Sequence, residues 1–466
     1  MSFLDNIIER LPEVKGPSEK FVSFNTKLKW TLIILGAFFI LSIVPLYGLG
    51  QNALSQFETL SIILGASFGS ILSLGIGPIV TASIVLQLLS GSGILKFDTT
   101  TKEGRMRFQG IQKIAAVGFI IFEAIIYVYL GGLMPPNTVN AETFRILQII
   151  LTGQLFLGGL IVLFMDEVLN KWGFGSGISL FIAAGVSSQI FIRIFSPLSR
   201  AGTLVFGTQE SPVGSIWVAL FSLLGGNFRE AILSILLILF TVLIFVVCVY
   251  AQSMKIEIPL SFGRIRGHGI RWPLKFLYTS NIPVILIAAL FANIQLWARL
   301  LEGWGYPILG TFSGNTPISG LVSWLFAPNL PAEIIGGSFQ LILLLKALVY
   351  VLTFIIGSVI FSVFWVQTSG MDAGAQAKQI LSSGLQVPGF RRDSRVIERL
   401  LERYISPLTV MGGVFIGFLA STADLLGALS SGTGLLLTVM IIYRLYEDIS
   451  RQHMADMYPG LRKMMG

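Results

Sequence analysis

Apolar residues gather in about ten long runs separated by short polar segments, a pattern that predicts a polytopic α-helical membrane protein. Most runs approach the roughly 20 residues that a helix needs to cross a bilayer. Hydrophobic residues make up 54% of the chain and charged residues only 12%, against about 25% charged in a soluble domain. The predicted spans lie near residues 30–49, 75–90, 110–130, 144–165, 175–195, 231–250, 281–301, 337–365, 405–424 and 432–447.

The second predicted span is unusually short. Residues 74–89 read "LGIGPIVTASIVLQLL", with Gly75, Gly77 and Pro78 at the start. A helix from Pro78 to Leu89 extends about 18 Å at roughly 1.5 Å per residue, whereas the hydrocarbon core is about 30 Å thick. The sequence therefore predicts a broken span at this position.

Basic residues predict the orientation of the spans. Of the 32 Lys and Arg residues, 26 fall in segments on one side, five fall on the other, and Lys346 lies within a span. Positive residues favour the cytoplasmic side, so both termini are predicted to be cytoplasmic in a cell-membrane protein. Ten spans divide into two sets of five with opposite orientation, which predicts inverted halves over residues 1–215 and 216–466.

The first residues carry charges and no central apolar core, so no cleavable signal peptide is expected. "SFLDNIIERL", residues 2–11, places its apolar side chains on one helical face. This pattern favours an amphipathic helix lying on the membrane surface, with a packed cytosolic helix as the alternative.

Motifs for catalysis or cofactor binding are not found in the sequence. "GFGSGIS" (173–179) does not fit the G-x-S-x-G nucleophile motif, and "GRIRGHG" (263–269) lacks the P-loop ending. The predicted spans contain no histidine that could serve as a base. Cys248 is the only cysteine, which excludes an intrachain disulfide. The sequence therefore disfavours an enzyme and predicts neither a cofactor nor a metal site.

Three predicted helices share a glycine-led start followed by bulky aliphatic residues. "GIGPIV" presents Ile76 and Val80, and "GSGISLFI" presents Ile178 and Ile182. "GTGLLL" similarly presents Leu437. In the first two helices the aliphatic residues lie four apart and share one face. This pattern favours a central apolar constriction, although ordinary helix packing also accounts for each motif alone.

Two further features point to function. Glu123 lies within a predicted span, where a charge is costly, and Gln87 and Asn293 are polar residues in other spans. Interhelical hydrogen bonding is the alternative interpretation for Glu123. Residues 254–275 and 378–403 form long basic loops that would attract anionic lipid or a polyanion such as RNA.

Six motifs in order give the chain a resemblance to the SecY family, the channel subunit of the Sec protein-conducting translocon, and to its archaeal branch in particular. They are "LGIGPIVTASIVLQLLSGSGI" (74–94), "FQGIQK" (108–113), "GSGISLFIAAGV" (175–186), "IEIPLSFGRIRG" (256–267), "SNIPVILIAALFANIQLW" (280–297) and "PLTVMGGVFIGFLA" (407–420). The resemblance covers nearly the whole chain, while residues 196–230 and 302–336 match poorly.

The resemblance implies an all-α fold of ten transmembrane helices in two inverted five-helix halves around a central pore, with a plug helix near residues 60–73. It also implies a lateral gate between the second and third spans on one side and the seventh and eighth on the other. The long loops 251–280 and 367–404 would bind the ribosome. The implied residues are Ile76, Val80, Ile178, Ile182, Ile285 and Leu437 for the pore ring; Ile62, Ile63, Leu64, Phe68 and Ile71 for the plug; Thr81, Gln87, Glu123 and Asn293 for the gate; and Arg264, Arg266 and Arg391 for the ribosome-binding loops.

The implied function is a passive channel that translocates unfolded secretory polypeptides and releases transmembrane segments laterally into the membrane. Its implied partners are a SecE-type (gamma) subunit, a Sec-beta subunit, the ribosome with its RNA, signal sequences, nascent chains and membrane lipids. An inverted-repeat secondary transporter is the main alternative, and an insertase without a continuous pore is a third.

Overall fold

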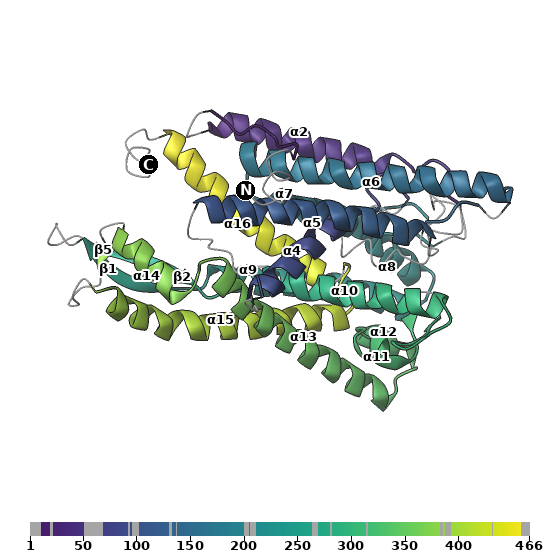
Figure 1. The fold of residues 1–466 in the computed structure, drawn as a ribbon. Helices are drawn as coiled ribbons and strands as arrows, with labels where there is room; N and C mark the ends of the chain where they lie inside the picture. Colours follow the sequence, from purple (N-terminus) through teal and green to yellow (C-terminus); the bar gives the residue numbers. More distant parts are fainter. Residues whose placement is uncertain are drawn as a thin grey trace.

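The computed structural model is a bundle of long helices with a small β-sheet at one end (Figure 1). It describes residues 11–18, 22–50, 69–91, 94–95, 102–129, 133–136, 138–199, 205, 211–262, 269–279, 282–313, 316–382, 385–386, 393–430 and 432–457. The predicted surface helix near the N-terminus lies almost entirely outside these residues.

Helices follow one another along the chain, with short strands inserted in its second part. The first group is α2 (Phe24–Ile43), α4 (Gly77–Gly91), α5 (Lys102–Tyr129), α6 (Ala141–Trp172), α7 (Gly177–Phe195), α8 (Ser215–Leu224) and α9 (Phe228–Ser253). The second is β1 (Lys255–Phe262), β2 (Gly269–Lys275), α10 (Ile282–Gly303), β3 (Phe312–Ser313), β4 (Thr316–Pro317), α11 (Gly320–Trp324), α12 (Leu330–Gly336), α13 (Leu341–Thr368), α14 (Ala373–Ser382), β5 (Leu385–Gln386), α15 (Ser394–Leu425) and α16 (Gly432–Met457).

Each of the ten predicted spans coincides with a helix. Among the described residues, eight helices are long and apolar enough to cross a membrane. The other two are α4, which has 15 residues, and α16, which carries several charged residues in its second half. The prediction of a polytopic helical membrane protein is therefore confirmed, and the count of ten crossings stays a prediction.

Several helix ends differ from the predicted limits for local reasons. The first predicted span reaches residue 49, but α2 ends at Ile43 because Pro45 follows and Val44 is extended. In the other direction, α15 begins at Ser394, eleven residues before the predicted start. The Asp393 side chain caps it by accepting a hydrogen bond from the Arg395 amide at 3.0 Å.

The helices form two layers with a pair of helices between them. Figure 1 shows α2, α5, α6 and α7 in the upper layer and α9, α10, α13 and α15 in the lower layer. Between the layers, α4 contacts α5, α10 and α13, while α16 contacts α7, α9 and α15. The main hydrophobic core runs through this middle zone and includes side chains from both layers.

Small residues let helices within the lower layer approach closely. A Cβ built on Gly417 of α15 would lie 2.9 Å from the Ile355 Cα on α13. One turn earlier, a Cβ on Gly413 would lie 2.8 Å from the Ser362 hydroxyl oxygen. Small residues at such positions increase van der Waals contact between membrane helices, so α13 and α15 form a tightly packed pair.

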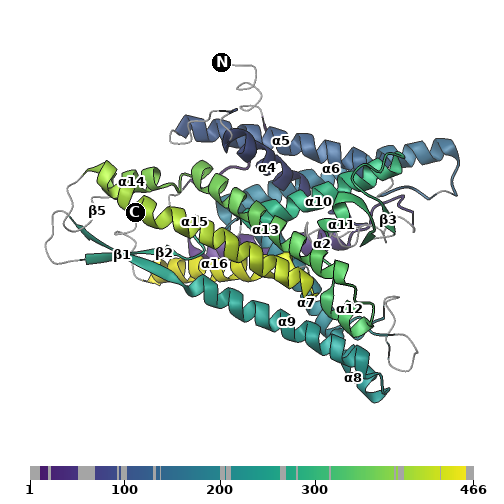
Figure 2. The same cartoon turned by 90° about the horizontal axis from the view of Figure 1, so that it is seen from below.

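A β-hairpin projects beyond one end of the bundle, which we call the hairpin end (Figure 2). β1 pairs antiparallel with β2, and β5 adds to the other edge of β1. Across the hairpin, Arg271 Nη1 donates to Glu257 Oε2 at 3.0 Å. This hydrogen bond, together with the positive charges of Arg271 and the nearby Lys255, lowers the pKa of Glu257. The sequence analysis predicted projecting loops in this region and did not predict strands.

The N-terminal segment is tied to α5 and α6 at the hairpin end. Glu167 on α6 accepts hydrogen bonds from Lys113 on α5 at 2.8 Å, from Lys171 at 3.0 Å and from the Val14 amide at 3.2 Å. Lys113 also donates to the Pro12 carbonyl at 2.7 Å. One carboxylate therefore joins two helices and the segment that precedes them.

An isolated β-bridge joins the end of the first span to the turn before α4. Pro45 pairs antiparallel with Ser70, and the Ile71 amide donates to the Val44 carbonyl at 3.0 Å. This turn packs directly on α6, where a Cβ on Gly158 would lie 2.0 Å from the Ile71 carbonyl oxygen. Both ends of the intervening segment are thus held side by side.

Candidate functional site

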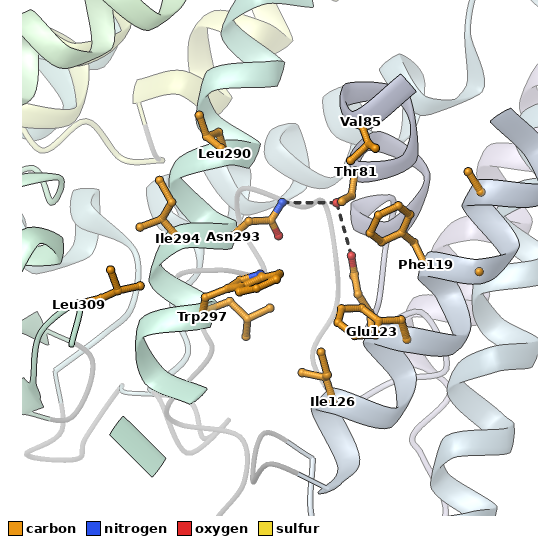
Figure 3. A pocket seen from close by; sticks show the side chains of 14 residues that line it. Thr81, Val85, Phe119, Glu123, Ile126, Leu290, Asn293, Ile294, Trp297 and Leu309 are labelled. Carbon is orange, nitrogen blue, oxygen red and sulfur yellow. Dashed lines mark hydrogen bonds between the residues drawn. The ribbon is translucent and has the colours of Figure 1, made fainter. Parts of the chain in front are cut away.

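A cavity of about 700 Å³ lies between α4 and α5 on one side and α10 on the other (Figure 3). Its walls are mostly apolar and include Val85 from α4, Phe119 and Phe122 from α5, and Ile294 and Trp297 from α10. Apolar walls of this kind suit a hydrophobic segment, because they offer it contact area without requiring hydrogen bonds.

Three polar side chains meet in this cavity. The Asn293 amide on α10 lies 3.4 Å from the Thr81 hydroxyl on α4, and that hydroxyl lies 3.4 Å from Glu123 Oε1 on α5. Thr81 also donates to the Gly77 carbonyl at 2.9 Å within its own helix. Figure 3 shows the three groups pointing toward one another across the cavity. The two interhelical hydrogen bonds are long, so they join α10 to α4, and α4 to α5, only weakly.

The fourth residue of the predicted gate, Gln87, lies on α4, but its side chain is outside the described part of the structure. Three of the four predicted gate residues are therefore brought together. Their gating role stays a prediction.

The six predicted ring residues come from the turn before α4 and from α4, α7, α10 and α16. Ile76, Val80, Ile182 and Leu437 are buried in the main hydrophobic core, and Ile178 and Ile285 pack against it. Helices far apart in the sequence thus place these side chains in one cluster. That they seal a pore stays a prediction.

A second cavity, of about 730 Å³, lies between this cluster and the hairpin end, and we call it the vestibule. Three ring residues, Val80, Ile178 and Ile285, contribute to its lining. Its other walls combine polar and charged side chains with apolar ones. The polar residues include Ser83, Gln112, Ser176, Ser179, Gln252, Thr279, Arg444, Glu447, Asp448 and Arg451, and the apolar residues include Phe174, Leu277, Ile282 and Met371. The vestibule is therefore of mixed polarity, with aliphatic ring residues in part of its wall.

Two pairs of side chains that line the vestibule were not predicted from the sequence. Gln112 on α5 donates to the Ser83 hydroxyl on α4 at 2.6 Å, and Lys275 at the end of β2 forms an ion pair with Glu447 on α16. Gln112 lies within "FQGIQK", so a polar residue on the inner face of a span was the available signal. The pair between Lys275 and Glu447 joins residues 172 apart, and no local pattern predicts it.

Several predicted site residues lie outside the described residues. These are four of the five plug residues, Ile62, Ile63, Leu64 and Phe68, and all three loop arginines, Arg264, Arg266 and Arg391. The remaining plug residue, Ile71, is partly buried and packs against a second core cluster that includes residues of α5 and α6. Among the described residues, no group of three or more His, Cys, Asp or Glu side chains could hold a metal ion.

A helical membrane bundle with a wide cavity of mixed polarity lined in part by an aliphatic cluster, and an apolar cavity to one side, is the architecture of a channel-type protein. The SecY family profile matches residues 70–446, and the profile for the plug domain of Sec61p matches residues 37–69. The chain belongs to the SecY family, whose members form the protein-conducting channel of the translocon.

Relatives and solved structures match over nearly the whole chain. Protein translocase subunit SecY of Methanothermobacter thermautotrophicus is 45% identical over 461 residues, covering 98% of this chain and 97% of that protein. The same subunit of Methanocaldococcus jannaschii is 41% identical over 467 residues and covers all of both chains. A solved protein-conducting channel has a TM-score of 0.82 and 40% identity, covering 98% of this chain and 99% of that chain. Sec61 in a canine ribosome–channel complex has a TM-score of 0.80 and 39% identity with the same coverage. The matches confirm the predicted family and favour a channel over a secondary transporter.

Proposed function

We propose that the aliphatic cluster is the seal of a passive pore through which unfolded polypeptides cross the membrane. The observation that carries this proposal is the meeting of Val80, Ile178 and Ile285 from three helices in the wall of the vestibule. Aliphatic side chains offer ions no ligands, and they offer a polar backbone no strong hydrogen bonds. Such a ring can therefore close around a moving chain without binding it.

Two serine substitutions on α10 test the seal. Ile285 lines the vestibule, whereas Ile287 is buried against Gly357 of α13. We expect Ile285→Ser to increase ion conductance in planar bilayers. Ile287→Ser should lower stability in detergent without increasing conductance. Equal conductance in the two variants, for channels shown to be folded, contradicts the seal.

We further propose that the cavity between α4, α5 and α10 is the lateral gate, where an apolar signal sequence inserts. Its apolar walls and the long hydrogen bonds among Thr81, Glu123 and Asn293 support this role. Hydrogen bonds between membrane helices contribute on average about 0.6 kcal/mol each, so separating α10 from α4, which breaks the bond between Asn293 and Thr81, costs only about 0.6 kcal/mol in hydrogen bonds. An inserting apolar helix can offset that cost by burying its own surface in the cavity.

Crosslinking tests the gate. A photoreactive residue at Trp297, which lines the cavity, should crosslink to the signal sequence of a stalled secretory chain. The same probe at Tyr250, an exposed residue of α9 outside this cavity, should not. Comparable crosslinking from both positions contradicts the assignment.

Further assignments extend the proposal. The two halves, 1–215 and 216–466, have opposite orientations in the cell membrane, and both termini lie in the cytoplasm. The 26 basic residues on one side support this orientation. Residues near 60–73 act as a plug, a role supported by the plug-domain match to residues 37–69. A SecE-type subunit and a Sec-beta subunit are proposed as partners of the protein from family membership, and co-purification tests them. Labelling single cysteines near each terminus in intact cells tests the orientation.

Ribosome binding through the basic loops is supported by their charge and by the ribosome complex of the Sec61 relative. Reversing the charge of Arg264, Arg266 and Arg391 should weaken binding in a salt-dependent manner, because contacts to RNA phosphates release counterions. Reversing Arg145, on the opposite side of the predicted membrane, is the matched control. Unchanged affinity in the triple variant contradicts this assignment.

A further inference from the structure

Two aspartates hold the starts of α7 and α16, two of the four helices that carry ring residues, in the same way. On α6, Asp166 Oδ1 accepts a hydrogen bond from the Ile178 amide in the first turn of α7 at 2.9 Å. On α15, Asp424 Oδ1 accepts one from the Gly432 amide in the first turn of α16 at 2.6 Å. In both cases a carboxylate on the preceding helix caps the next one.

A glycine makes this approach possible in each case. A Cβ on Gly177 would lie 2.6 Å from the Asp166 Cα, and a Cβ on Gly432 would lie 2.4 Å from the Asp424 amide nitrogen. The start of each ring helix is therefore packed on the backbone of the helix that carries the aspartate. The glycines at the starts of α7 and α16, which the sequence pattern identified, therefore allow these close contacts.

The two carboxylates have further partners that fix their direction. Asp166 also interacts with the side chain of Asn170, one turn along α6. Asp424 Oδ2 accepts a hydrogen bond from the Tyr350 hydroxyl of α13 at 2.8 Å. The first amides of a helix have no partner within the helix, and an unsatisfied amide is costly inside a membrane. A negatively charged acceptor at that end is also favoured by the helix dipole.

The caps lie on opposite sides of the ring. Residues just before α7, such as Ser176, line the vestibule together with the second half of α16, including Arg451. The start of α16 at Gly432 is about 28 Å from Arg451 at roughly 1.5 Å per residue. Ile182 lies four residues after Ile178, whose amide is capped, and Leu437 lies five residues after Gly432; these are distances of about 6 and about 7.5 Å along the helix. A shift at either cap is therefore transmitted over less than two turns to the ring.

We propose that Asp166 and Asp424 are positioning residues that set the position of the ring side chains on α7 and α16, one from each side of the membrane. The inference rests on the proposed seal. Under this proposal, α7 is held in place by α6, and α16 is held in place by α15. An asparagine retains an oxygen that accepts the same amide bonds, whereas an alanine does not.

The test compares Asp166→Ala, Asp166→Asn, Asp424→Ala and Asp424→Asn in the full chain reconstituted in bilayers. The control is Asp372→Ala, because Asp372 Oδ2 caps α14 by accepting from the Ala375 amide at 3.2 Å and α14 carries no ring residue. Loss of a cap typically shifts the local equilibrium about fivefold, or about 1 kcal/mol at 1.4 kcal/mol per tenfold change.

We expect amide hydrogen exchange at the start of α7 or α16 to increase about fivefold in the alanine variants, with a severalfold larger ion leak. The asparagine variants should stay close to the wild type in both measurements. Asp372→Ala should increase exchange in α14 alone and leave the leak unchanged. Unchanged exchange in the alanine variants of Asp166 and Asp424 overturns the proposal. The proposal is also overturned if Ile285→Ser leaks while the alanine variants of Asp166 and Asp424 show faster exchange but leak no more than Asp372→Ala.

A crosslinking measurement separates failure of this proposal from failure of the seal. Ile182→Cys and Leu437→Cys are introduced with Cys248→Ser, and their crosslinking yield reports the alignment of α7 with α16. We expect the yield to fall in Asp166→Ala and to recover in Asp166→Asn. If neither Ile285→Ser nor the aspartate variants leak but the yield falls, the seal is wrong and the positioning role stands. A wild-type yield in Asp166→Ala overturns the positioning role.

Discussion

Replacing Gly158 with alanine should displace the turn that precedes α4. The added Cβ would lie 2.0 Å from the Ile71 carbonyl oxygen, whereas such carbon–oxygen contacts are normally about 3.3 Å or longer. The turn or α6 must therefore move by about 1.3 Å. Overpacking of this kind typically costs about 1–3 kcal/mol. A cost in that range shifts the population away from the packed turn by about 5- to 150-fold.

The displacement should reach the pore because Ile76 lies at the end of the same turn and is only 2% exposed. We expect Gly158→Ala to raise the closed-channel leak in planar bilayers at least fivefold and to lower thermal stability in detergent. The matched control is Gly153→Ala on the same helix, because no atom lies within 4 Å of a Cβ built there. That variant should be neutral or slightly more stable, since alanine favours helix over glycine by up to about 1 kcal/mol.

The two alanine variants together give a clear refutation. If Gly158→Ala is as stable as Gly153→Ala and its leak equals that of the wild type, the turn is not held against α6 as described. A loss of stability without a leak would show that the turn packs on α6 but does not position Ile76.

Three further predictions concern regions outside the pore. Glu167→Gln should weaken the attachment of residues 12–15 to α5 and α6, so protease cleavage of that segment in the folded protein should accelerate. The pKa of Glu257 is lowered, so its ionised carboxylate stabilises the hairpin above the ordinary glutamate pKa, and this contribution is lost as pH falls through the folded pKa. Hydrogen exchange in β1 and β2 should therefore increase below about pH 4 in the wild type and not in Glu257→Gln. Near neutral pH, exchange in Glu257→Gln should match exchange in Arg271→Gln. Cys248 is 1% exposed, so maleimide should label it only after unfolding, and rapid labelling of the folded protein would contradict its burial.

Much of the helical architecture could be predicted from hydropathy. Apolar runs of spanning length predicted where the helices lie, and glycine and proline predicted that α4 would be short. The hairpin of β1 and β2 was not predicted as strands, because Pro259 and Pro273 interrupt the β pattern. Their pairing depends on a register between separate segments, which local propensity does not specify.

The site was predictable to different degrees. Ile76, Val80, Ile178 and Ile182 follow from helical spacing after glycine. The proximity of Asn293 to Thr81 depends on how α10 packs, and only the family resemblance predicted it. Asp166 and Asp424 were not predicted as site residues, because capping of one helix by another cannot be inferred from spacing along either helix.

The bridge between Pro45 and Ser70 bears on the kinetics of the closed channel. It holds the two described ends of the segment between the first span and α4 side by side, so the proposed plug is anchored at both ends in the same chain. Blocking of the proposed pore by that plug is then an intramolecular event, whose effective concentration does not depend on how much protein is present. Reclosure should accordingly follow first-order kinetics with a rate independent of channel density in the membrane.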